Sequence, residues 1–111
     1  MRHEMQRMER RRFRREGFSA PASIATESAA AHGTVLDLSI CGVLFEAGDP
    51  GANLRLGDVV TLRTSGNGED IVAVGRIVHC SDRLFGIAFD HLDVESRRSI
   101  RRVLESKTVG T

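Results

Sequence analysis

Two short segments contain the residues best suited to binding chemistry. Residues 11–15 read Arg-Arg-Phe-Arg-Arg, and residues 37–42 read Asp-Leu-Ser-Ile-Cys-Gly. Arginine carries a permanently charged, planar fork of N–H donors, which suits phosphate oxygens and the O6/N7 edge of guanine. Arginine has no acceptor, whereas the carboxylate of Asp37 and the hydroxyl of Ser39 can accept from the N1 and N2 groups of guanine. Together the segments predict a site for an anionic guanine nucleotide.

The order and separation of these segments resemble the motif pair of the PilZ domain, R-x-x-x-R followed by D/N-x-S-x-x-G. Five residues match these motifs: Arg11, Arg15, Asp37, Ser39 and Gly42. The resemblance covers roughly residues 9–106. It implies a bacterial receptor or adaptor that binds cyclic di-GMP on the outer barrel surface. In that class of site the two arginines hold phosphates and Hoogsteen edges, Asp37 and Ser39 fix guanine, and Gly42 permits close contact.

Two further arginines adjoin the first motif and are candidates for additional ligand contacts. Arg10 directly precedes it, and by the resemblance a residue at this place accompanies binding of the ligand as a stacked dimer. Arg14 stands where the family often has a small residue or proline, so it adds charge without an assigned role. The resemblance also implies a downstream partner protein, whose identity the sequence does not give.

The positive charge is concentrated at the amino end. Residues 1–16 carry seven arginines and three glutamates, a net +4, whereas residues 17–111 carry nine basic and twelve acidic residues, a net −3. A terminal basic run is usually a solvated tail or a non-specific nucleic-acid patch. Its combination with the second motif favours a ligand clamp instead. We expect residues 1–17 to form a flexible basic arm that orders over a bound anion.

After this arm the sequence alternates as β-strands do. In residues 34–39, Leu36 and Leu38 alternate with Asp37 and Ser39, so the polar pair is expected to point outward together from one strand. Five further short strands are expected, near residues 18–24, 43–46, 58–64, 70–80 and 83–90. Six short antiparallel strands predict a small β-barrel, because closure hides the strand edges.

The carboxyl end is typical of a helix. Asp93 is a suitable N-cap, and Ile100, Val103 and Leu104 share one apolar side of a helix that should end near Ser106. Its four arginines are expected to form a solvated face: Arg97, Arg98, Arg101 and Arg102. We therefore expect one mainly-β domain over residues 18–106, a six-stranded antiparallel barrel with a C-terminal helix packed on it. Residues 107–111 would form a tail.

The remaining features argue against an enzyme and against a metal or cofactor site. Asp37 and Ser39 have no histidine at a triad-like position. The segment Gly66-Asn67-Gly68 lacks the Lys-Ser/Thr pair of a phosphate-binding loop and indicates a turn. The histidines and cysteines show no paired spacing of metal ligands. No catalytic residue, metal or cofactor is therefore predicted, and the ligand is expected to be cyclic di-GMP itself.

Two alternatives to a nucleotide receptor stay open. One is a PilZ-like protein-interaction module without nucleotide binding. The other is a nucleic-acid-binding barrel, which the scarcity of stacking rings disfavours, since the chain has five Phe and no Trp or Tyr. No apolar stretch approaches the ~20 residues that a membrane span needs, and the start lacks the apolar segment of a signal peptide. A cytoplasmic protein without membrane insertion or DNA binding is expected.

Overall fold

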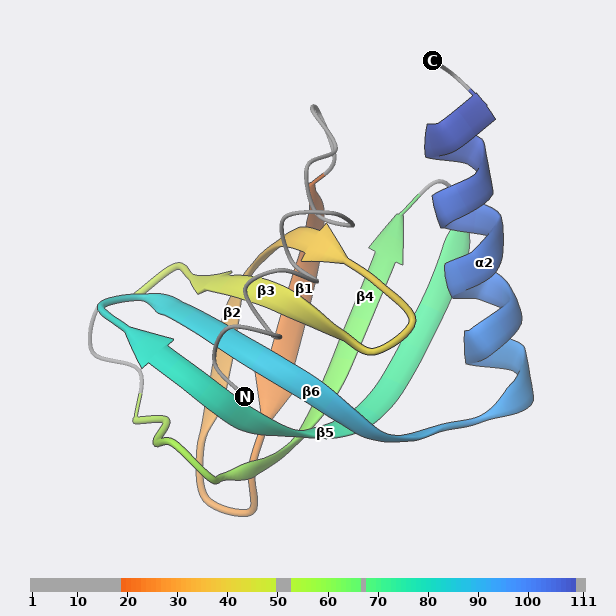
Figure 1. The fold of residues 1–111 in the computed structure, drawn as a ribbon. Helices are drawn as coiled ribbons and strands as arrows, with labels where there is room; N and C mark the ends of the chain where they lie inside the picture. The colour runs from red at the N-terminus through yellow and green to blue at the C-terminus, as the bar shows by residue number, and fades with distance from the viewer. Residues whose placement is uncertain (1–18, 50–52, 67, 110–111) are drawn as a thin grey trace.

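In the part of the chain that the structure describes, six antiparallel strands close into a barrel and a helix packs against it (Figure 1). The computed structural model describes residues 19–49, 53–66 and 68–109, with side chains described as far as residue 105. Within this part, the elements are β1 (Ala20–Ala25), β2 (Ala30–Leu38), β3 (Gly42–Ala47), β4 (Val59–Gly66), β5 (Glu69–Ser81), β6 (Leu84–Leu92) and α2 (Val94–Val109). Around the barrel the strands follow the order β1-β2-β3-β6-β5-β4, and pairing of β1 with β4 closes it. The predicted fold class is confirmed.

The strands form because alternate residues can be buried inside the barrel while the others face outward. In β4, for example, Val60 and Leu62 are 1% and 0% exposed, whereas Val59 and Arg63 lie on the surface. The largest fully buried apolar side chains come from β1 to β6 and from α2: Phe45, Ile24, Leu62, Ile77, Ile87, Ile100, Val35, Val60 and Val103. The barrel interior and the buried side of α2 thus form one core.

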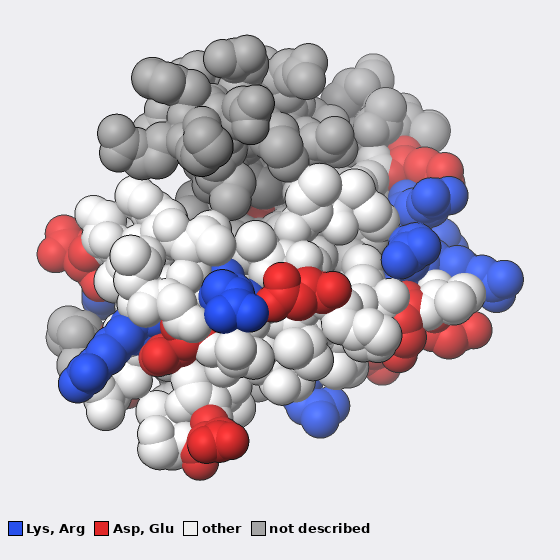
Figure 2. All heavy atoms as spheres, turned by 60° about the horizontal axis from the view of Figure 1, so that its bottom comes forward, with Lys and Arg blue, Asp and Glu red and all other residues white. Residues whose placement is uncertain are grey.

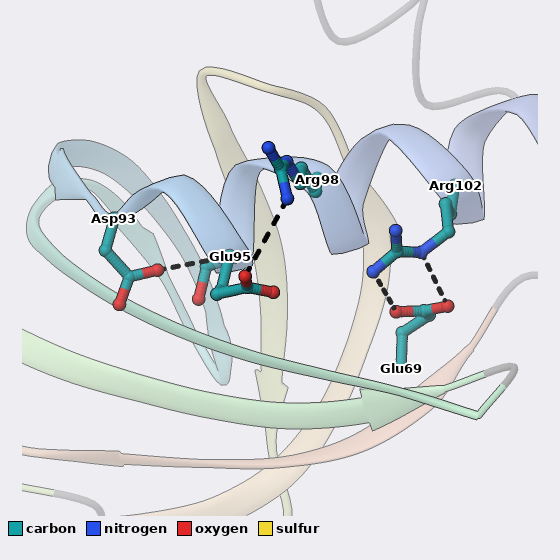
Figure 3. Close-up of polar contacts among 6 residues, drawn as sticks. Glu69, Asp93, Glu95, Arg98 and Arg102 are labelled. Atoms are coloured by element: carbon teal, nitrogen blue, oxygen red, sulfur yellow. Dashed lines mark hydrogen bonds and ion pairs between the residues drawn. The ribbon is translucent and has the colours of Figure 1, made fainter.

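The helix begins and packs as the sequence predicts. The Asp93 carboxylate accepts a hydrogen bond from the Ser96 backbone N–H at 2.8 Å, which makes Asp93 the N-cap (Figure 3). The same hydrogen bond holds the pKa of Asp93 below its ordinary value. Ile100 and Val103 are buried in the core, and Leu104 packs against it. The helix runs on to Val109, past its expected end near residue 106.

Two polar contacts join α2 to β5. The Ser96 hydroxyl accepts from the Val72 backbone N–H at 3.1 Å. Further along the helix, Arg102 binds Glu69 through two hydrogen bonds, Nε to Oε2 at 2.9 Å and Nη2 to Oε1 at 3.1 Å (Figure 3). This bidentate pair lowers the pKa of Glu69. The helix is therefore held to the barrel wall at two places by polar groups as well as by its apolar side.

Candidate functional site

The second motif forms the tight connection between β2 and β3. The Ser39 backbone N–H donates to the Gly42 carbonyl at 2.9 Å. The Ser39 hydroxyl accepts from the backbone N–H groups of Cys41 at 3.0 Å and Gly42 at 3.2 Å. The side chain of Ser39 is only 1% exposed. The motif thus supplies the hydrogen bonds that fold its own turn, of the kind in which a serine hydroxyl satisfies nearby backbone donors.

The expectation that Asp37 and Ser39 point outward together from one strand is wrong. The pairing of β2 with β3 shifts between Val35 and Asp37, so Leu36 is an extra residue at a β-bulge. Val35 and Leu38 both point into the core although three positions separate them. The strand ends at Leu38, and the next residue, Ser39, is buried in the turn. Strict alternation therefore fails across this segment.

Asp37 keeps its expected outward position. It is paired across the sheet with Leu44 of β3, whose neighbours Val43 and Phe45 are both buried in the core. Since successive residues of a strand face opposite sides, Leu44 and its partner Asp37 lie on the outer face. Both side chains are half-buried. Asp37 is thus the acidic group of the motif on the barrel surface.

The hydroxyl of Ser39 has little capacity left for a ligand. A serine oxygen has two acceptor positions, and the Cys41 and Gly42 amides occupy them. The hydroxyl proton lies towards the Gly42 carbonyl oxygen at 3.4 Å. Within the motif, Asp37 is therefore better placed than Ser39 to accept hydrogen bonds from a guanine base. Contact of either residue with a nucleotide stays a prediction.

Gly42 is required by the barrel itself. A Cβ atom at this position would lie 2.2 Å from the carbonyl oxygen of Ile87 in β6. No ordinary side chain fits at that distance without displacing the neighbouring strand. One residue earlier, the Cys41 carbonyl accepts from the Phe89 N–H at 2.8 Å. From the sequence, a turn or a nearby ligand was expected to explain this glycine. The close packing of β3 against β6, which the structure shows, was not predicted.

The outer face beside Asp37 carries one large apolar side chain, Leu44, and then glycine and alanine. Across β3 and β6, the outward row that contains Asp37 continues through Leu44 to Gly86. The adjacent outward row pairs Gly42 with Ala88. Gly42 and Gly86 are buried, whereas Leu44 and Ala88 are half-buried, so Leu44 and Ala88 supply the exposed part of these two rows. Leu44 and Ala88 can make apolar contact with a base while Asp37 accepts hydrogen bonds from the edge of that base.

The arginines of the first motif belong to the part of the chain that the structure does not describe. All four predicted arginine contacts lie outside the described residues: Arg10, Arg11, Arg14 and Arg15. The predicted basic arm, residues 1–17, lies there too. The structure therefore describes only the Asp37, Ser39 and Gly42 half of the candidate site.

The described surface shows no metal centre and no membrane-spanning helix. Over the described residues, no three His, Cys, Asp or Glu side chains gather to hold a metal ion. None of the described helical segments is both long and apolar enough to cross a membrane. In Figure 2 charged side chains are scattered over the barrel and gather more densely at the edge formed by α2. Cys41 and Cys80 are free and exposed.

Comparison with known proteins gives the class. The family model of the PilZ domain matches residues 9–106, and the chain belongs to the PilZ domain family, a group of cyclic di-GMP-binding and adaptor modules. A solved structure with a similar fold is the PilZ domain of CeSA from a cellulose-synthesizing bacterium. It has a TM-score of 0.63 and 22% sequence identity, and the match covers 80% of this chain and 92% of that one. No curated protein matches the chain.

Proposed function

We propose that this protein is a cyclic di-GMP receptor or adaptor that couples the level of the second messenger to a partner protein. The observation that carries the proposal is the outward, half-buried carboxylate of Asp37 next to Leu44 on the outer face of the barrel. The same chain, a member of the PilZ family, also contains the arginine pair Arg11 and Arg15. Donor and acceptor groups for a guanine nucleotide are therefore both present in the chain.

Each residue of the site has a distinct part. Arg11 and Arg15 bind phosphate oxygens and the Hoogsteen edge of guanine as bidentate donors. Asp37 accepts from guanine N1 and N2. Ser39 and Gly42 act through the turn that holds Asp37 in place. Arg10 and Arg14 add positive charge next to the ligand, and Arg10 favours a stacked ligand dimer.

Calorimetric titration of the purified protein with cyclic di-GMP tests the proposal, with GTP and single-stranded DNA as control ligands. Replacing Arg15 with alanine should cost about 2 kcal/mol or more of binding free energy, roughly thirtyfold in affinity, because a charge-assisted bidentate contact is lost. Arg15→Lys should also bind poorly, since an ammonium group cannot reproduce the fork. Arg98→Ala, on an exposed helix position, is the matched control. Unchanged affinity in Arg15→Ala would contradict the assignment.

A second titration separates recognition of the base from attraction to phosphate. Asp37→Ala should weaken cyclic di-GMP more than cyclic di-AMP, because adenine lacks the N1 and N2 donors of guanine. Glu46→Ala removes a carboxylate from the same β2–β3 region and should leave the ratio of the two affinities unchanged. An equal loss for both ligands in Asp37→Ala would mean that Asp37 does not read the base.

The coupling step is ordering of the arm on binding. Residues 1–16 contain seven arginines, and a doubly anionic ligand offsets their mutual repulsion, so binding and ordering favour each other. In hydrogen exchange, amides of residues 10–17 should gain protection on saturation with cyclic di-GMP, while Ile77 and Ile87 in the core change little. An arm protected without ligand, or still unprotected at saturation, would show that the signal passes through another element.

A further inference from the structure

A small pocket lies between the end of β6, the first turns of α2 and the β2–β3 turn. Its volume is about 260 Å³. Its apolar wall consists of Ile40, Phe89 and Leu92, which are half-buried and pack against the barrel core. Arg97 and Arg101 of α2 also line the pocket. The pocket therefore combines an apolar wall with two guanidinium groups.

These two arginines differ from their neighbours on the helix. Arg98 lies 3.9 Å from Glu95, and Arg102 forms the bidentate pair with Glu69 (Figure 3). Arg97 and Arg101 have no carboxylate within ion-pair distance anywhere in the described ranges. They are four positions apart, so they lie on the same face of the helix. The solvated face expected from the sequence is thus two pairs of arginines with different surroundings.

The other polar groups of the pocket do not neutralise this charge. Asp90 is the one carboxylate among the described residues that line it, and Asp90 is paired with Arg76 at 3.5 Å. His91 also lines the pocket and is exposed. The pocket rim therefore carries a surplus of positive charge beside its apolar wall.

We propose that this pocket binds an acidic peptide segment of a partner protein, with an apolar side chain in the pocket and carboxylates on Arg97 and Arg101. Bidentate pairing with carboxylates is one of the strong, geometrically specific contacts that guanidinium groups make. The volume lies below the roughly 300–1,000 Å³ of small-molecule sites, which suits a peptide side chain better than a nucleotide. The chain's own amino-terminal arm carries a net +4, so its charge opposes occupation of this pocket.

The pocket shares a wall with the second motif. Ile40 belongs to the turn between Asp37 and Gly42, and the Phe89 N–H donates to the Cys41 carbonyl of the same turn. A nucleotide that shifts this turn also shifts the apolar wall of the pocket. The nucleotide thus changes the affinity for the acidic peptide. This coupling rests on the proposed function, whereas binding of the peptide to the free protein does not.

The test uses a fluorescent peptide probe, Glu-Glu-Leu-Phe-Glu-Glu, with anisotropy recorded on the full chain at about 0.15 M salt, where distant surface charges are screened. Control probes replace every Glu by Gln, or Leu-Phe by Ser-Ser. The charge reversals Arg97→Glu and Arg101→Glu should each weaken binding of the acidic probe at least about tenfold. Arg98→Glu, the matched reversal on the same helix, should change it less than about threefold. Both control probes should bind at least about tenfold more weakly.

Three results would overturn the pocket as an acidic-peptide site. They are no binding of the acidic probe at millimolar protein, equal binding of the Gln probe, and a loss in Arg98→Glu as large as that in Arg97→Glu. Thermal unfolding of each variant shows whether the fold is retained, and backbone amide shifts of Ile40 and Leu92 on adding the probe report the site directly. Equal probe affinity with and without cyclic di-GMP, in protein shown by calorimetry to be saturated, would overturn the coupling alone.

Discussion

Replacing Ser39 with alanine tests how far the β2–β3 turn depends on one hydroxyl. The oxygen accepts from the Cys41 and Gly42 amides at 3.0 and 3.2 Å in a side chain that is 1% exposed. Cys41 is exposed, so its amide can turn to water, whereas Gly42 is buried. A buried donor left without a partner costs about 1–3 kcal/mol, and an ordinary hydrogen bond contributes about 1 kcal/mol. We expect Ser39→Ala to lower the free energy of unfolding by about 2–3 kcal/mol.

Thr26→Ala is the matched control, because Thr26 makes the same contacts in the turn between β1 and β2. Its hydroxyl accepts from the amides of Ala29 at 2.9 Å and Ser28 at 3.2 Å. Thr26 is half-buried and Ser28 is exposed, so water can replace the lost acceptor. The loss in Thr26→Ala should therefore stay below about 1 kcal/mol.

Urea unfolding followed by circular dichroism measures both losses at one temperature. At about 4 °C or more per kcal/mol for a domain near this size, Ser39→Ala should also lower the melting temperature by roughly 8 °C or more. A loss in Ser39→Ala no larger than that in Thr26→Ala would refute the reasoning. It would mean that the buried turn can satisfy its amides without the serine hydroxyl.

Three further outcomes can be checked on the same material. Gly42→Ala should destabilise the protein by about 2 kcal/mol more than Gly48→Ala in urea unfolding, since the added Cβ meets Ile87 O at 2.2 Å in the first and His32 O at 3.2 Å in the second. Hydrogen bonds from Ser96 lower the pKa of Asp93 from its ordinary value of 3.8. The ionised carboxylate therefore stabilises the fold above pH 3.8, and this stabilisation is lost as the pH falls through the folded-state pKa. Asp93→Asn should reduce the drop in melting temperature between about pH 5 and pH 2. Arg102→Gln should lower the free energy of unfolding less than Ser39→Ala does, because the Arg102 side chain is 53% exposed, and it should speed hydrogen exchange in the last turns of α2.

The barrel and its helix could be predicted because their signals are local. Alternation along β4 follows from burial of every second side chain, as at Val60 and Leu62. The start of α2 follows from Asp93 and the apolar spacing of Ile100 and Val103. The boundaries were less accurate because the ends of elements depend on their neighbours: β2 begins at Ala30, earlier than expected, and α2 extends beyond residue 106.

The candidate site was predicted less completely because its geometry depends on contacts distant in sequence. The bulge at Leu36 is a matter of register between β2 and β3, and nothing in residues 34–39 alone reveals it. The demand for glycine at position 42 comes from Ile87 of β6. The partner of Arg102 is Glu69, 33 residues away. Asp37 was placed correctly on the outer face, but Ser39 was not.

The residues of the second motif have two different roles in the hydrogen-bonded turn that joins β2 to β3. Ser39 and Gly42 are required for this barrel to close its turn and to bring β3 against β6, whether or not a ligand ever binds. Asp37 lies before this turn, on the outer face of β2. A relative that no longer binds the nucleotide would therefore still need serine and glycine at these positions, because the fold requires them. A genome survey that aims to distinguish nucleotide-binding members from members that do not bind should therefore use the acidic position and the arginine pair as criteria. The serine and the glycine have little diagnostic value.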